Sequence, residues 1–190
     1  MKKFVLLILS VLFTAFTMAQ NVNVQKESAH VNGEKLEGFE VTLEGTIAEV
    51  TTSLNSYLKT MGKTRLKGDV ITIQEPSING TKYTLPVFAL SKGKQSNTAA
   101  WIGISASNWP EEDVKKVNKE LEKTLYEFGV KFNRDKIQVQ IDESSRATLA
   151  VEKQQQKLVN QNKDLNVKLE DNRREKIQLE ESLENNRLEY

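Results

Sequence analysis

The chain has 190 residues, of which 27 are Lys or Arg and 26 are Asp or Glu, and it contains one histidine and no cysteine. The absence of cysteine excludes disulfides and thiolate zinc sites, and the balanced charge leaves no excess of cations to displace counterions from a nucleic acid. The same balance argues against an acidic membrane surface as a partner.

The first 19 residues have the three-part pattern of a secretory signal peptide. Lys2 and Lys3 precede an almost unbroken apolar run at 4–16, and small residues at 17 and 19 favour cleavage before Gln20. At ~1.5 Å per residue, a helix of thirteen to sixteen residues spans about 20–24 Å, less than the roughly 30 Å of a bilayer's hydrocarbon core. We therefore expect a cleaved signal and a secreted or periplasmic mature protein. It is not a lipoprotein, because no cysteine can carry the lipid.

A shift in composition divides the mature chain in two. Every glycine and proline lies at or before Gly129, so the last part of the chain lacks the residues that most often interrupt regular structure. We expect a signal peptide at 1–19, a small α+β domain at 20–142, and a long polar helix at 143–190.

The first half of the expected domain reads as two strands and a helix. Asn32-Gly33 is typical of a hairpin turn, and the alternation of apolar and polar residues at 39–44 predicts a half-buried strand. Thr46 and Glu49 have the spacing of a capping box, which predicts a helix beginning there and ending at Gly62.

The second half is predicted as three strands, a helix and a last strand. The strands are expected at 69–75, 83–90 and 98–106, with turns at 77–80 and 92–94. A helix beginning at Asn108 and closed by Gly129 follows. The last strand is predicted from the alternation at Ile137, Val139 and Ile141.

The resulting fold class is α+β, in the order β-β-α-β-β-β-α-β. It predicts a mostly antiparallel sheet with two helices packed on one face, followed by a long C-terminal helix. The expected core residues are apolar positions on the inner faces of these elements: Val41, Val50, Leu54, Leu58, Ile71, Ile73, Ile102, Ile104, Val117, Leu121, Leu125, Val139 and Ile141.

The C-terminal helix has a heptad pattern. Its apolar positions are Val151, Leu158, Leu165 and Leu179 at d, with Leu169 and Leu183 at a. The remaining a and d positions include Gln155, Asn162, Asn172, Lys176 and Asn186, so about half of all a and d positions are polar, which predicts a weak coiled coil. Two interpretations stay open: a helix that associates with itself or a partner, and a solvated single helix that frays past Arg173.

Few residues could carry chemistry. His30 is the only histidine and lies beside the Asn32-Gly33 turn, where we expect exposure and no catalytic role. The acids at 111–113 lack the spacing of a calcium loop and are better explained as compensating a helix N-terminus. We expect no catalytic residues, no metal and no cofactor.

Trp101 shares a strand face with Gly103 and Ser105. The first interpretation is an exposed aromatic platform for a ligand. The second is that Trp101 covers the sheet's second face against the long helix.

These patterns favour a non-enzymatic interaction or scaffold protein. Its helix would bind a second copy of the chain or another protein of the envelope. The alternative is a small-ligand domain that binds an envelope glycan or lipid on the Trp101 face.

Overall fold

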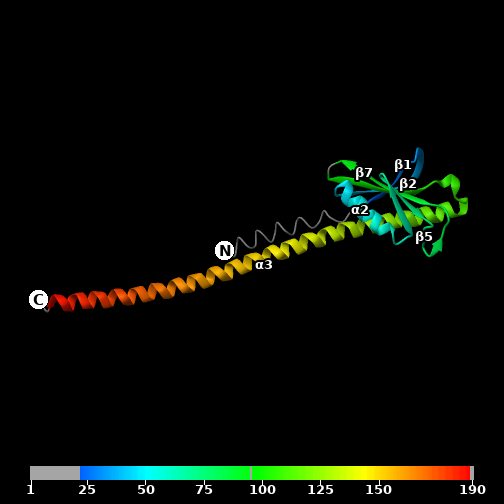
Figure 1. Ribbon diagram of the computed structural model, residues 1–190. Coiled ribbons are helices and arrows are strands. Elements are labelled where there is room, and N and C mark those ends of the chain that lie inside the picture. The colour runs from blue at the N-terminus through cyan, green and yellow to red at the C-terminus, as the bar shows by residue number, and fades with distance from the viewer. Residues whose placement is uncertain (1–21, 95, 189–190) are drawn as a thin grey trace. The chain divides into compact units, whose positions relative to one another are not determined.

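The computed structural model describes residues 22–94 and 96–188, so the expected signal peptide lies outside the described residues. The chain divides into two compact units, the first ending at Ile137 and the second beginning at Gln138. We call the described residues of the first the α+β unit and residues 138–188 the C-terminal segment (Figure 1).

A six-stranded antiparallel sheet forms the centre of the α+β unit, in the spatial order β1-β2-β8-β7-β4-β3. Its strands are β1 (Val24–Val31), β2 (Glu34–Glu44), β3 (Lys63–Lys67), β4 (Val70–Gln74), β7 (Val87–Lys94) and β8 (Asn97–Ile104). Two short strands, β5 (Ser77–Ile78) and β6 (Thr81–Lys82), pair separately. The prediction of an α+β fold with an antiparallel sheet and a long C-terminal helix is confirmed.

Left-handed residues make the tight turns. Asn32 (φ 52°) and Gly33 (φ 92°) join β1 to β2, as the sequence predicted. Asn79 and Gly80 have the same conformation, but their turn closes the small β5–β6 ribbon. The turn expected at 92–94 is wrong, because these residues belong to β7.

Helix α2 (Ile47–Leu58) begins at the predicted capping box. The Glu49 backbone N–H donates to Thr46 Oγ1 (3.3 Å), and the Thr46 N–H donates to Glu49 Oε2 (2.8 Å). The hydrogen bond from the Thr46 backbone, followed by that from its hydroxyl, holds the pKa of the Glu49 carboxyl below its usual range. The negative charge is therefore retained at the positive end of α2 at neutral pH.

Gly62 does not end α2 in the left-handed conformation. The helix stops at Leu58, and its C-cap Lys59 is right-handed. A Cβ at Gly62 would lie 3.0 Å from the Gln74 carbonyl oxygen, so the glycine instead permits a close approach to the end of β4.

Helix α3 (Glu111–Leu188) follows a short 3₁₀ turn at Ala106–Asn108, and it corrects two predictions. Gly129 does not end a helix: a Cβ there would lie 2.7 Å from Val22 Cγ1, so the glycine makes room for a neighbouring side chain. The strand predicted at 137–141 is also helical.

The physical reason is that two of the three apolar residues at 137–141 fit a helix as well as a strand. Ile137 and Ile141 are four residues apart and therefore share a helix face, and no glycine or proline stands between 130 and 141 to stop the helix. Val139 and Ile141 are 56% and 47% exposed and contribute nothing to the core. The Lys136 ammonium, one residue before Ile137, still donates to the Glu44 carbonyl at the end of β2.

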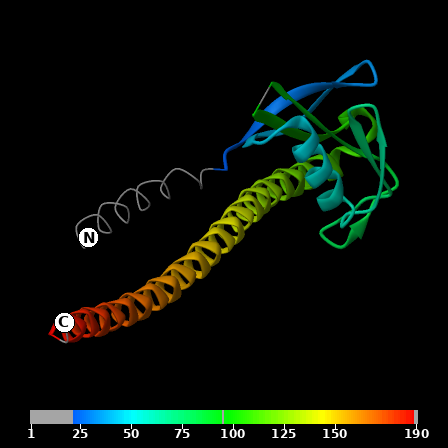
Figure 2. The ribbon, with the colours of Figure 1, turned by 60° about the vertical axis from the view of Figure 1, so that its left-hand side comes forward.

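The main core of the α+β unit lies between one face of the sheet and the helices α2 and α3 (Figure 2). The eleven expected core residues other than Val139 and Ile141 are all buried there. Phe128 of α3 packs on Tyr57 of α2 with ring centroids 5.6 Å apart. Burial, assisted by the Glu127 carboxylate, raises the pKa of the Tyr57 hydroxyl.

Candidate functional site

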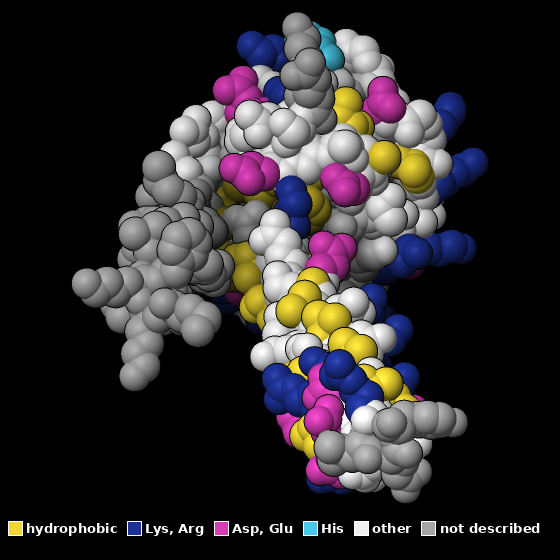
Figure 3. All heavy atoms as spheres, turned by 90° about the vertical axis from the view of Figure 1, so that its left-hand side faces the viewer, with side chains coloured by type: hydrophobic (Ala, Val, Ile, Leu, Met, Phe, Trp, Pro, Cys, Tyr) yellow, Lys and Arg dark blue, Asp and Glu magenta, His cyan; other side chains and the backbone are white. Residues whose placement is uncertain are grey.

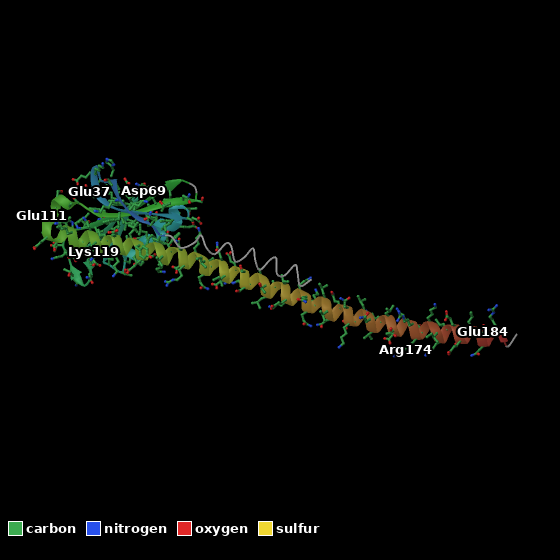
Figure 4. The ribbon with its side chains drawn as sticks, turned by 180° about the vertical axis from the view of Figure 1, so that it is seen from behind. Glu37, Asp69, Glu111, Lys119, Arg174 and Glu184 are labelled. Carbon is green, nitrogen blue, oxygen red and sulfur yellow. The ribbon has the colours of Figure 1, made fainter. Side chains whose placement is uncertain are left out.

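The C-terminal segment is helical throughout, and each residue from 138 to 187 is exposed. At ~1.5 Å per residue, 138–188 extends for about 76 Å. Side chains leave this part of α3 on all sides, among them Arg174 and Glu184 (Figure 4).

The six heptad residues named from the sequence lie along one face of this helix. At 100° per residue they fall within a sector of about 80°. We call this set the leucine seam: Val151, Leu158, Leu165, Leu169, Leu179 and Leu183. Their exposure runs from 49% at Leu169 to 67% at Val151. Hydrophobic side chains recur among charged ones along the helix in Figure 3.

Other apolar side chains of the segment lie off the seam. Leu149 and Val167 are 56% and 55% exposed, and both point about 160–200° away from the centre of the seam. They have the same residue chemistry and the same exposure as the seam, so they serve as matched controls for it.

Ion pairs within the C-terminal segment contribute little to the stability of its helix. Arg173 Nη1 lies 2.9 Å from Glu170 Oε1, and Lys176 Nζ lies 3.5 Å from Glu180 Oε1. All four side chains are more than half exposed, and such i,i+3 and i,i+4 pairs contribute only ~0.2–0.5 kcal/mol each. In proteins most helical stability comes from packing of an apolar face, and the apolar side chains of this segment are exposed.

Trp101 is fully buried, so the expectation of an exposed platform is wrong. Its ring lies against Gly38 and Gly103: a Cβ at either position would come within 2.6 Å of a ring atom. The indole Nε1–H donates to the Glu27 carbonyl oxygen at 2.8 Å. A ligand could not stack on this ring without displacing the strands around it.

The long helix does not cover Trp101 either. Its cluster consists of residues from β1, β2 and β7: Ala29, Val31, Leu36 and Leu90, with Val70 and Phe88 at its margin. The β1–β2 hairpin therefore supplies the cover on the face of the sheet opposite α2. Val151 and Leu158, two residues of the long helix that the second interpretation would place against Trp101, are exposed.

Ser105, the third residue of the proposed ligand face, lines a hollow of about 190 Å³ with Asn108 and Trp109. A second hollow of about 270 Å³ lies beside Lys26 and Asn118. Both are smaller than the ~300–1,000 Å³ that small-molecule sites usually occupy. Neither brings Trp101, Gly103 and Ser105 together.

His30 lies on β1 and is exposed, in keeping with its place beside the hairpin turn. Within residues 22–94 and 96–188, no three His, Cys, Asp or Glu side chains gather in a way that could hold a metal ion. Over the same described residues, no helix has the length and apolar character needed to cross a membrane.

Comparison with protein families, with curated proteins and with solved structures finds no significant match to the chain.

Proposed function

We propose that the protein is a secreted or periplasmic, non-enzymatic scaffold whose C-terminal helix assembles with a second helix through the leucine seam. One observation carries the proposal: six large apolar side chains share one helix face, and each is about half exposed or more. Six large apolar side chains that recur on one helix face, even with polar residues between them, are the pattern of a helix that packs against another helix.

The composition of the seam sets the expected strength of this association. On the helix face that carries the leucine seam, about half of the a and d positions are polar, among them Asn162, Asn172 and Lys176. Polar residues at such positions reduce the stability of a coiled coil and restrict its register. We therefore expect a reversible complex with a dissociation constant in the micromolar range, and not an obligate one. The helix partner is a second copy or another envelope protein.

The cleavable signal peptide expected at residues 1–19 supports an extracytoplasmic location, and the balanced charge disfavours a nucleic-acid partner. A ligand-binding role on the Trp101 face has less support, because the indole is covered by the β1–β2 hairpin.

Static light scattering on residues 20–190 and on residues 20–142 tests the proposal. We expect the longer chain to show a mass above that of one chain at high micromolar concentration, and the shorter to stay monomeric. Circular dichroism of the shorter chain, with a cooperative melt, is the control for an intact α+β unit. If both are monomers at these concentrations, assembly through the helix is wrong.

A further inference from the structure

On the helix face that carries the leucine seam, the sequence of polar and apolar residues is nearly the same when it is read from either end. Between 162 and 186 the a and d positions alternate at steps of three and four residues. They are, in order, Asn162, Leu165, Leu169, Asn172, Lys176, Leu179, Leu183 and Asn186. Two leucines, two central polar residues and two leucines are thus enclosed by asparagines. The centre of this pattern falls at residue 174.

A two-stranded antiparallel coiled coil places the a position of one helix opposite the d position of the other. If two copies cross at residue 174, every a or d residue faces the d or a residue that lies equally far on the other side of 174, while flanking e and g positions face e and g positions of the second copy. Leu165 then faces Leu183 of the second copy, and Leu169 faces Leu179. Asn162 faces Asn186, so polar side chains also oppose polar side chains.

From this self-complementarity we propose that the partner of the leucine seam is a second copy of this chain, bound antiparallel and centred on residue 174. The inference rests on the proposed function and names its partner and orientation. Such an interface is isologous, since the same surface serves both copies and each contact occurs twice.

The charges favour this orientation over a parallel one. In a parallel, in-register pair Lys176 would oppose Lys176 inside the seam. The flanking g and e positions would also place Lys168 against Arg173 twice and Glu175 against Glu180 twice. These four contacts between like charges would oppose association, and so would the two buried Lys176 side chains that face each other.

In the antiparallel pair Lys176 faces Asn172 of the second copy, and the ammonium can donate to the amide oxygen. Like charges meet only on the two-fold axis, once at Arg173 and once at Glu175. Arg173 already has a carboxylate partner within its own helix, Glu170 at 2.9 Å.

In the antiparallel dimer the second copy covers the C-terminal end of the leucine seam and leaves Val151, at its N-terminal end, uncovered. The overlap runs from about residue 160 to residue 188 in each copy, roughly 43 Å at 1.5 Å per residue. In a protein of residues 20–190, no residue of the second copy stands opposite Val151, so Val151→Gln should leave the dissociation constant of that protein within about twofold of the unchanged value. In a parallel dimer Val151 would form an apolar layer, and the same substitution would weaken binding severalfold.

Disulfide trapping in the full mature chain tests the orientation, and the absence of native cysteine makes single substitutions unambiguous. Leu169→Cys and Leu179→Cys are oxidised separately and as an equal mixture. Cα atoms must come within ~7 Å for a disulfide to form. We expect cross-linked dimer in the mixture and at most a trace in either variant alone. Efficient cross-linking of each variant by itself would mean a parallel dimer and would overturn the inference.

A spin label at Lys153→Cys gives a second measurement that leaves the seam unaltered, because residue 153 is an f position. An antiparallel dimer centred on 174 separates the two labels by about 63 Å along the axis. A parallel dimer keeps them roughly 20–30 Å apart, since helix axes lie 8–10 Å apart. A short distance in a dimer of confirmed mass overturns the orientation and leaves the proposed function standing. A monomeric mass at high micromolar concentration overturns both.

Discussion

Replacing Leu165 and Leu169 together by glutamine should convert the protein from a dimer into a monomer at concentrations where the unchanged chain is dimeric. Each copy loses two apolar contacts, so four sites in the dimer are affected. At ~1 kcal/mol per partly buried leucine the loss is about 4 kcal/mol, or roughly a thousandfold in the dissociation constant. Sedimentation velocity over a concentration series measures the change.

The matched control is Leu149→Gln with Val167→Gln. These side chains are as exposed as the seam leucines but lie on the opposite side of the helix. We expect the control to dimerise like the unchanged chain. Equal weakening by both pairs would mean that general hydrophobicity, and not the seam, holds the complex together.

Trp101→Ala should destabilise the α+β unit by about 3–5 kcal/mol, the usual cost of emptying a large aromatic site. The indole is fully buried, and its ring occupies the space that Gly38 and Gly103 leave free. The substitution also leaves the Glu27 carbonyl without the indole N–H. Since domains are stable by only ~5–15 kcal/mol, much of the stability would be lost. Chemical denaturation measures it from the shift in midpoint at constant slope.

Two further variants test whether the lost packing of the indole causes the destabilisation by Trp101→Ala. Trp101→Phe keeps a ring in the site and should cost distinctly less than the alanine variant. Tyr126→Ala removes an aromatic ring that is 50% exposed on α3 and should change stability by less than about 1 kcal/mol. An effect at Trp101→Ala as small as that at Tyr126→Ala would contradict the buried position of the indole.

Local patterns that depend on a few neighbouring residues were readable from the sequence. Asn32-Gly33 predicted the hairpin because both residues adopt left-handed conformations at low cost. Thr46 and Glu49 predicted the start of α2 because each side chain satisfies the other's backbone donor. The α+β class followed from the order of these elements.

Features that depend on distant contacts were not readable. The strand β3 (Lys63–Lys67) carries three cations in five residues and lacks a hydrophobic period, as suits a sheet edge that must resist pairing with other chains. The cover over Trp101 comes from β1 and β2, whose twist over the sheet has no sequence signature. At 137–141, Ile137 and Ile141 fit the period of a helix as well as that of a strand, and the helix formers around them decide between the two.

Part of the candidate site could be predicted from the sequence. Heptad spacing named the six seam residues, and the structure places all of them on one exposed helix face. The symmetry of the seam about residue 174 is present in the sequence too. It gains structural meaning once α3 is known to be unbroken from Glu111 to Leu188, since a break would interrupt the register.

We propose that a second helix completes the C-terminal segment. Circular dichroism of a peptide of residues 138–190, at concentrations from about 1 µM to about 1 mM, tests it most directly. An isolated helix in water is only marginally stable, whereas association stabilises it by covering the leucine seam. We predict helicity that rises with concentration, in step with a mass that approaches two chains in sedimentation equilibrium. Helicity independent of concentration, with the mass of one chain throughout, would contradict the account.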